Sequence, residues 1–107
     1  MSRCLWEVLV PTVSNTGRPF RTRHHRVWDK KVRAIAGGLT LIKPVSGQWV
    51  APCGTLFSER MIPVRVACTA KQMEQIADWV AKHYLQLAVM YWKVSDEVVI
   101  KHYGDKS

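Results

Sequence analysis

The stretch TAKQMEQIADWVAKHY, residues 69–84, decides the fold. Thr69 followed three residues later by Gln72 is typical of a capping box, in which each side chain binds the backbone N–H of the other residue and starts a helix. Apolar side chains then recur at helical spacing, namely Met73, Ile76, Ala77, Val80, Ala81 and Tyr84. The stretch therefore predicts an amphipathic helix that covers an apolar surface with one face.

The segments around this helix predict strands and one more helix. Patterns of β-forming residues, helical spacing and turn residues divide the chain. In order they indicate a strand over 5–10, a helix between Pro19 and Ala36, a bent strand over 39–42 and 46–50, a strand over 59–68, the helix quoted above, and a closing hairpin of strands over 87–94 and 97–103.

This order predicts an α+β fold of the ferredoxin-like, split βαβ type, with an antiparallel sheet, two helices on one face and an extra C-terminal strand. We expect a single domain over residues 1–107, with a frayed tail at 104–107. Two helices cover only one face of a sheet, and we expect the other face to carry Trp6, Val64, Val66 and Tyr91. Such a face predicts self-association.

Length and composition narrow the class of protein. The chain has 107 residues, 48% hydrophobic and 22% charged, which is typical of a folded domain and excludes extensive disorder. No apolar run approaches the roughly 20 residues of a membrane span, and the first residues lack the pattern of a signal peptide. We therefore expect a cytoplasmic protein without a membrane partner.

The cysteines and histidines do not form a metal-binding pattern. Three cysteines, Cys4, Cys53 and Cys68, have no CxxC spacing, and we expect reduced thiols. The four histidines form no HxxxH or HExxH pair. The sequence predicts no metal site.

A basic segment extends from Arg18 to Arg33, and the whole chain has a formal net charge of +8. The charge favours acidic or polyanionic partners, such as nucleic acid, although a solvated helix face explains the same pattern. The aromatic strand motif of RNA-recognition domains is absent, as are the motifs of common hydrolases, kinases and dinucleotide-binding enzymes.

A sparse set of polar and aromatic residues remains. Trp49 follows Gly47 in the bent strand, Glu59 enters the next strand, and Gln86 follows the quoted helix. Each has a structural explanation as well: Trp49 as a core side chain, Glu59 as an exposed charge at a strand edge, and Gln86 as a polar residue at a helix end. The sequence alone leaves both interpretations open.

The succession of these residues resembles phage-encoded S-adenosylmethionine (SAM) lyases over most of the chain. The family pattern has an aromatic residue ten positions before an acidic one and a glutamine 27 positions after it, which matches Trp49, Glu59 and Gln86. This sequence departs from the pattern in having tryptophan where the compared member has tyrosine, and in one residue inserted between Glu59 and Cys68.

The resemblance implies an enzyme that converts SAM to methylthioadenosine and homoserine lactone, without cofactor or metal. It implies a catalytic role for Glu59 and substrate binding by Trp49 and Gln86; we add Ser14 and Asn15, in the loop after the first strand, to the substrate-binding set. It also implies a homotrimer with the site between protomers, in the host cytoplasm. The alternatives are a SAM hydrolase that releases homoserine and a non-enzymatic basic module that binds nucleic acid or an acidic protein.

Overall fold

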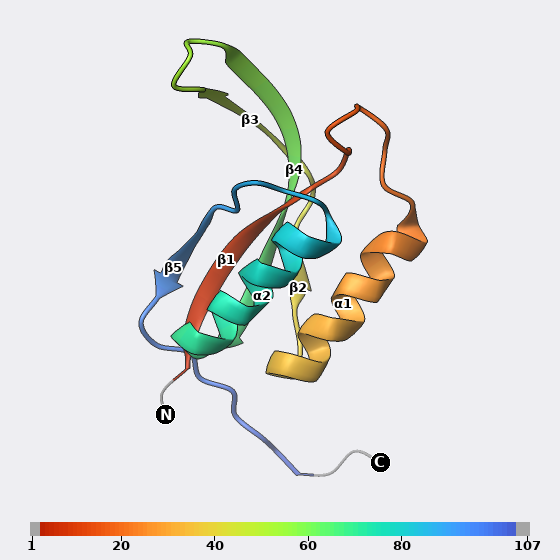
Figure 1. Cartoon of the computed structure of the whole chain (residues 1–107). Coiled ribbons are helices and arrows are strands. Elements are labelled where there is room, and N and C mark those ends of the chain that lie inside the picture. Colours follow the sequence, from red (N-terminus) through yellow and green to blue (C-terminus); the bar gives the residue numbers. More distant parts are fainter. Residues whose placement is uncertain (1–2, 105–107) are drawn as a thin grey trace.

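The computed structural model describes residues 3–104 and has the expected mixed α+β architecture (Figure 1). One antiparallel sheet of five strands carries two helices on the same face. The elements are β1 Cys4–Pro11, α1 Thr22–Ala36, β2 Thr40–Leu41, β3 Val45–Val50, β4 Leu56–Cys68, α2 Ala70–His83 and β5 Tyr91–Ser95. Most of the tail for which we expected fraying, residues 105–107, lies outside the described part of the chain.

Strand β4 organises the sheet. Its inner half pairs with β1 on one side and with β2 on the other, and its outer half pairs with β3. The strand order of the sheet is β2-β4-β1-β5, and β3 pairs with β4 further along the same edge as β2. The predicted bent strand is thus two strands on the same neighbour, interrupted at 42–44. Pro63 of β4 lies at this interruption, where Ile42 donates a hydrogen bond to the Pro63 carbonyl at 3.0 Å.

The core lies between the sheet and the two helices. Val8 and Val64 are direct neighbours on β1 and β4, and both are almost fully buried. Helix residues complete this core, namely Trp28, Val32 and Ala36 from α1 and Met73, Ile76, Ala77 and Val80 from α2. Side chains three and four positions apart share one helix face, which is why these spacings predicted the buried stripe.

The residues that we expected on the uncovered face of the sheet lie on the helix-covered face instead. Val64 and Val66 are buried beneath the helices, and Trp6 and Tyr91 share their side of the sheet because they lie opposite Val66 and Val8. The uncovered face carries the alternate residues. Its centre is an ion pair between Glu7 and Arg65, with 2.9 Å between Oε1 and Nε.

The predicted capping box is confirmed. The Thr69 hydroxyl accepts a hydrogen bond from the Gln72 backbone N–H at 3.2 Å, and the Gln72 carboxamide oxygen accepts one from the Thr69 N–H at 2.9 Å. The other end of the same carboxamide donates to the Ile35 carbonyl at 3.0 Å, in the last turn of α1. One side chain therefore both starts α2 and holds it against the end of α1.

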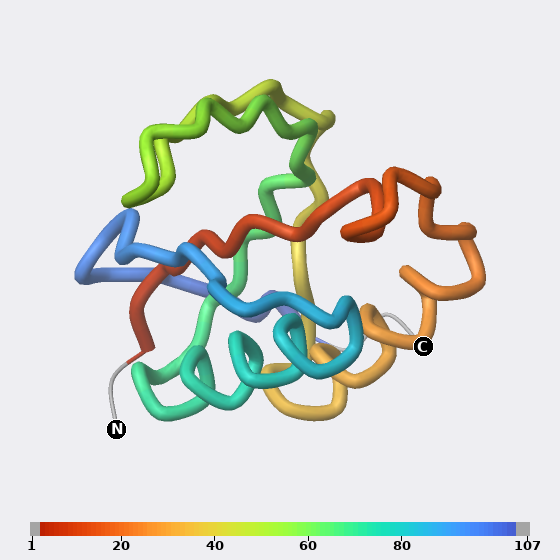
Figure 2. Tube along the Cα trace, turned by 45° about the horizontal axis from the view of Figure 1, so that its top comes forward, coloured from red at the N-terminus to blue at the C-terminus, as the bar shows by residue number. Residues whose placement is uncertain are grey.

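The outer part of β4 leaves the helix-covered sheet together with β3. These two strands and the 51–55 turn form a hairpin, here called the arm, which extends beyond both helices (Figures 1 and 2). The molecule is elongated, with dimensions of 52 × 29 × 22 Å. The sequence suggested a loop ahead of Glu59, whereas β4 begins three residues earlier at Leu56.

The predicted C-terminal hairpin is wrong in detail. A strand forms only over Tyr91–Ser95, where it pairs with β1, and residues 97–103 form no strand. The Ser95 hydroxyl stabilises a turn after β5. It donates a hydrogen bond to the Glu97 carbonyl and accepts one from the Glu97 N–H. The 97–103 segment has β-forming residues but no strand beside it, and strand propensity is realised mainly through cross-strand packing.

Within residues 3–104, neither helix combines the length and the apolar character required to cross a bilayer.

Candidate functional site

Trp49 and Glu59 lie on one face of the arm. Trp49 is opposite Phe57 and Gly47 is opposite Glu59, so the four positions form two successive cross-strand pairs with the same orientation. The Trp49 and Phe57 rings stack with centroids 4.8 Å apart, and Trp49 remains 48% exposed. Trp49 is therefore a surface side chain and not core filler.

Glu59 stands next to open space because the residue opposite it has no side chain. A methyl group added to Gly47 would meet nothing closer than the Glu59 carbonyl oxygen, at 4.0 Å. Glu59 is exposed, and among residues 3–104 its carboxylate has no hydrogen-bond or ion-pair partner. A free carboxylate diagonal to an exposed indole is able to attract a cationic ligand.

Ser14, Asn15 and Gln86 meet at a different place, which we call the corner. The Asn15 amide nitrogen donates to the Leu85 carbonyl at 3.0 Å and thereby joins the loop after β1 to the loop after α2. The Gln86 amide nitrogen donates to the Tyr84 carbonyl at 3.0 Å. Each amide keeps a carbonyl oxygen that accepts no hydrogen bond from the described residues.

Ser14 has a structural role in the corner. Its hydroxyl accepts a hydrogen bond from the Arg18 N–H at 3.2 Å and lies 3.0 Å from the Thr16 hydroxyl. Its backbone N–H donates to the Arg18 carbonyl at 2.7 Å. These contacts shape the loop in which Asn15 lies.

The structure therefore divides the predicted site residues into two groups. Trp49 and Glu59 belong to the arm, and Ser14, Asn15 and Gln86 belong to the corner. Thr12 connects the two regions, since its hydroxyl donates to the Arg60 carbonyl at 2.7 Å. Within residues 3–104 no hydrogen bond joins a side chain of one group to a side chain of the other.

A histidine cluster, which the sequence analysis did not single out, fastens the helices near the corner. The His24 and His83 rings stack at 3.8 Å, and each Nε2 lies 2.7–2.8 Å from the backbone carbonyl of the other residue. Next to them, His25 Nδ1 lies 2.7 Å from the Tyr84 hydroxyl. The local signal was the His24-His25 pair, but its partners lie 59 residues away, and only the fold joins them.

Burial changes the titration of this cluster. It lowers the pKa of His25, an effect that Asp29 partly opposes and that His24 and His83 reinforce. Burial raises the pKa of Tyr84, and the nearby Asp29 carboxylate adds to the rise. The pair is therefore a neutral hydrogen-bonded unit near pH 7.

The described residues contain no group of three or more histidine, cysteine or acidic side chains able to hold a metal ion. Cys4, Cys53 and Cys68 are free thiols.

The basic side of α1 is an exposed surface that includes Arg23, Lys30 and Lys31. The Lys31 ammonium also lies 4.9 Å from the centre of the Trp79 ring on α2. This cation–π contact helps to hold the helices together. Arg26, also on this helix, lines a cavity between α1 and the sheet.

Comparisons with known proteins identify the fold. No protein-family model matches the chain, and no curated protein matches its sequence. Among solved structures, a phage SAM lyase in complex with S-methyl-5'-thioadenosine is similar with a TM-score of 0.68 and 10% identity, over 95% of this chain and 88% of that one.

Proteins named for divalent cation tolerance have the same fold. The periplasmic CutA of Archaeoglobus fulgidus has a TM-score of 0.65 and 10% identity, over 92% of this chain and 88% of that one. The CutA1 of Thermus thermophilus has a TM-score of 0.62 and 9% identity, over 97% of this chain and 88% of that one. At these identities the similarity establishes the fold alone, which an enzyme and proteins with other names share.

Proposed function

We propose that this protein is a SAM lyase that releases methylthioadenosine and homoserine lactone. The observation that carries the proposal is the exposed carboxylate of Glu59 diagonal to the Trp49 indole, with Gly47 leaving space beside it. The fold shared with a phage SAM lyase supports the proposal, as does the spacing of Trp49, Glu59 and Gln86 that resembles that family.

The proposed reaction requires no activated water. The SAM carboxylate attacks the γ-carbon of its own methionyl chain, a C–O bond forms, and the C–S bond breaks with its electron pair on sulfur. The sulfonium thereby becomes the neutral thioether of methylthioadenosine. An enzyme promotes such a step by folding the chain into a reactive conformation, and well-oriented intramolecular reactions gain about 7–11 kcal/mol over bimolecular ones.

The charge balance of this step defines the role of Glu59. The sulfonium and the attacking carboxylate both lose charge in the transition state, so a carboxylate beside the sulfonium would favour the substrate over the transition state. The α-ammonium group keeps its charge throughout. Glu59 is therefore assigned to the ammonium group, where it bends the methionyl chain, and Trp49 to the face of the adenosyl part, on which an indole can stack.

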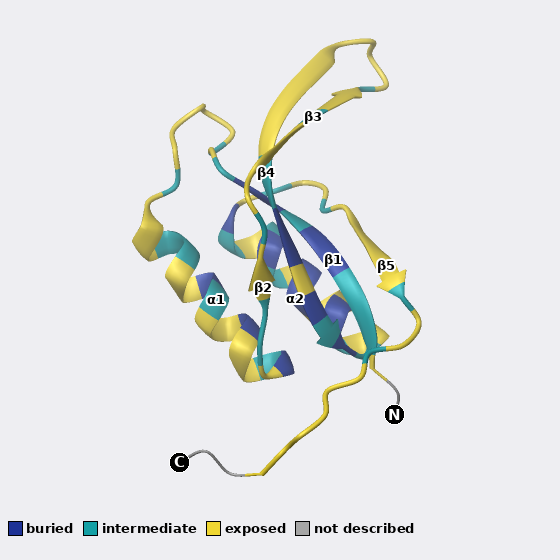
Figure 3. Ribbon diagram, turned by 180° about the vertical axis from the view of Figure 1, so that it is seen from behind, coloured by how far each residue is buried: buried dark blue, intermediate teal, exposed yellow. Residues whose placement is uncertain are grey.

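A shared site explains the separation of arm and corner. In one chain Glu59 and Trp49 project from a hairpin, while Asn15 and Gln86 present free amide oxygens elsewhere. By register, the Trp49–Glu59 face of the arm continues the uncovered face of the sheet. Figure 3 shows the sheet from this side, with the helices behind it. We propose a homotrimer in which the arm of one protomer closes against the corner of the next.

Product analysis tests this function. The purified protein, mixed with SAM in the presence of a chelator, should form methylthioadenosine well above the spontaneous rate, as measured by mass spectrometry. In ¹⁸O-water, homoserine that arises from an opened lactone carries the label in its carboxyl group, whereas direct hydrolysis labels the γ-hydroxyl. Label in the hydroxyl would replace the lyase with a hydrolase, and no turnover at high protein concentration would exclude both.

The second candidate is a basic module that binds nucleic acid. The observation that favours it is the row of exposed cationic residues on α1 and before it, which includes Arg21, Arg23 and Lys30. Replacement of these three by glutamine should abolish any DNA or RNA binding at low salt and should leave SAM cleavage unchanged. Binding of this kind weakens steeply as salt rises, because condensed counterions are released.

A further inference from the structure

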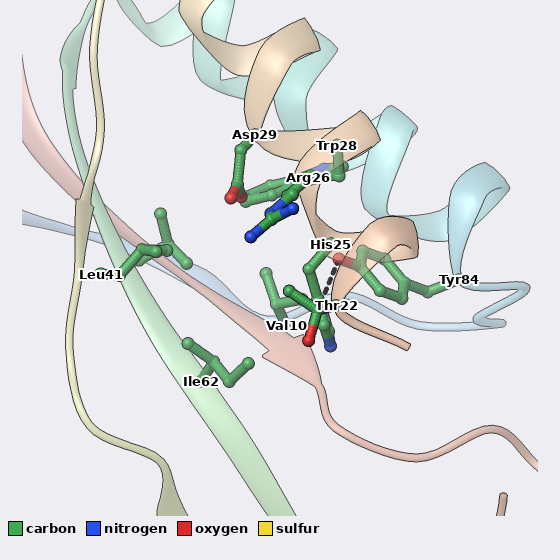
Figure 4. A pocket seen from close by; sticks show the side chains of 10 residues that line it. Val10, Thr22, His25, Arg26, Trp28, Asp29, Leu41, Ile62 and Tyr84 are labelled. Carbon is green, nitrogen blue, oxygen red and sulfur yellow. Dashed lines mark hydrogen bonds between the residues drawn. The ribbon is translucent and has the colours of Figure 1, made fainter. Parts of the chain in front are cut away.

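A cavity of about 320 Å³ lies between α1 and the sheet, on the side of β2 (Figure 4). Its sheet wall is aliphatic and consists of Val10, Leu41, Ile62 and Val64. None of the five residues assigned to SAM lines it. Small-molecule pockets in proteins range upward from about 300 Å³, so this one suits a small ligand.

The helix wall of the cavity carries two opposite charges. Figure 4 shows the Arg26 and Asp29 side chains on the side of α1 that faces Leu41 and Ile62. Within residues 3–104 neither group forms an ion pair or a side-chain hydrogen bond, with the other or with any third residue. Arg26 is exposed and Asp29 is partly buried, so both charged groups remain available to a ligand that enters the cavity.

A third unsatisfied group belongs to the same wall. The indole of Trp28 is only 1% exposed and lines the cavity, and its Nε1–H has no hydrogen-bond partner in the described structure. A buried donor without an acceptor costs about 1–3 kcal/mol. Partial burial raises the pKa of Asp29, and the charges of His25 and Arg33 oppose this rise.

We infer that this cavity binds a free α-amino acid with an aliphatic side chain. The ligand carboxylate pairs with the Arg26 guanidinium, which offers a fork of donors to two oxygens. The ligand ammonium pairs with Asp29. The aliphatic side chain of the ligand packs against Leu41, Ile62 and Val10. Because this wall is apolar, the cavity excludes most amino acids with polar side chains.

Calorimetric titration with L-leucine and two truncated analogues tests each contact separately. Isocaproate keeps the carboxylate and the aliphatic chain, and isoamylamine keeps the ammonium and the chain. Leucine should bind more tightly than either analogue. Arg26→Gln should weaken leucine and isocaproate about tenfold or more and leave isoamylamine unchanged, whereas Asp29→Asn should weaken leucine and isoamylamine and leave isocaproate unchanged.

Matched variants control for charge and folding. Arg23→Gln on the exposed side of α1 and Asp78→Asn on the surface of α2 make the same charge changes outside the cavity and should leave leucine binding intact. Leu41→Trp, at a half-exposed position, should fill the cavity and abolish binding without unfolding the protein. Circular dichroism of each variant verifies the fold.

Three outcomes would overturn the inference. They are no heat of binding at millimolar leucine, equal binding of leucine and one truncated analogue, and leucine binding that survives both Arg26→Gln and Asp29→Asn. The cavity shares no residue with the proposed SAM site, so none of these outcomes bears on SAM cleavage. In the same way, a protein that does not cleave SAM can still bind leucine in this cavity, and the titration tests that binding separately.

Discussion

The helix-covered half of the sheet and the arm differ in where they place large apolar side chains. In the covered half, Val8, Val64 and Ile76 are almost completely buried against one another. In the arm, Trp49 and Val50 are 48% and 63% exposed. Apolar burial drives folding, and exposed apolar clusters generally mark contact sites. The covered half therefore specifies the fold of one chain, and the arm is where we expect contacts with another molecule.

The largest expected effect is on stability, in the covered half. Ile76→Ala removes a fully buried side chain from α2 and leaves a cavity, which typically costs about 2–5 kcal/mol of unfolding free energy. Chemical denaturation measures the loss. Val99→Ala, at a position that is 76% exposed and lies outside the arm, is the matched control and should change stability by less than about 0.5 kcal/mol. Equal losses at the two positions would contradict the role of the covered half in specifying the fold.

The second effect is on activity, in the arm. Glu59→Gln keeps the shape of the side chain and removes the charge that holds the ammonium group and bends the methionyl chain, so SAM turnover should fall roughly 30- to 1000-fold, which corresponds to about 2–4 kcal/mol. The thermal midpoint should not change, because Glu59 has no partner among the described residues of its own chain, and light scattering shows whether the variant keeps the oligomeric state of the wild type. Glu74→Gln, on the exposed side of α2, is the control. Normal turnover by the Glu59 variant would remove this residue from the site.

The third effect is on assembly. The protein should behave as a trimer in light scattering, and the double variant Val50→Ser, Leu56→Ser should dissociate it, because these two residues form the most exposed apolar pair at the end of the arm. Neither residue is assigned to the substrate. Turnover should therefore decline with the fraction of trimer and reappear at high protein concentration. Val99→Ser, at an exposed position outside the arm, should keep the trimer. A wild-type protein of 12.3 kDa in solution would contradict the shared site.

The smallest effect is a pH dependence of stability in the covered half. The pKa of His25 is lowered below 6.5 in the folded state, so the unfolded state binds the proton more tightly. The resulting stabilisation is complete above pH 6.5 and decreases as pH falls through 6.5 toward the folded pKa. The raised pKa of Asp29 acts in the opposite direction closer to about pH 4.

Thermal midpoints between about pH 7.5 and 5.5, on either side of the ordinary histidine pKa, measure this slope. His25→Gln should flatten it, whereas His102→Gln, at an exposed position outside every helix and strand, should leave it unchanged. A slope that persists in the His25 variant would assign the dependence to other groups.

The sequence predicted most accurately those elements whose determinants are local. Helix α2 begins where the Thr69–Gln72 pair predicts, because the cap is formed by residues three positions apart. The 97–103 segment failed for the opposite reason, since a strand also requires a neighbour that no local pattern reveals. The sequence predicted extended segments on either side of residues 42–44, but it did not predict that both would pair with β4.

The candidate site shows the same limit. Spacing along the chain suggested Trp49, Glu59 and Gln86 together, yet the fold of one chain separates the arm from the corner. The contact of His24 with His83 and the cavity beside Arg26 join segments distant in sequence, so no local pattern predicted either of them. The roles of Ser14, Asn15, Trp49, Glu59 and Gln86 in substrate binding and catalysis remain predictions.

Pro63 makes the arm a modular unit of the sheet. A proline inside a strand lacks the N–H that a ladder requires, but here the N–H is missing where β4 changes neighbours from β3 to β2. Leu9, opposite Pro63 on β1, points its N–H away from β4 to the Met90 carbonyl at 3.1 Å, so the two residues are a pair without mutual hydrogen bonds and β1 needs no N–H from Pro63. Evolution is therefore free to lengthen or shorten the arm by even numbers of residues on each strand, because such changes preserve which side chains face outward and leave the register of the central ladder intact.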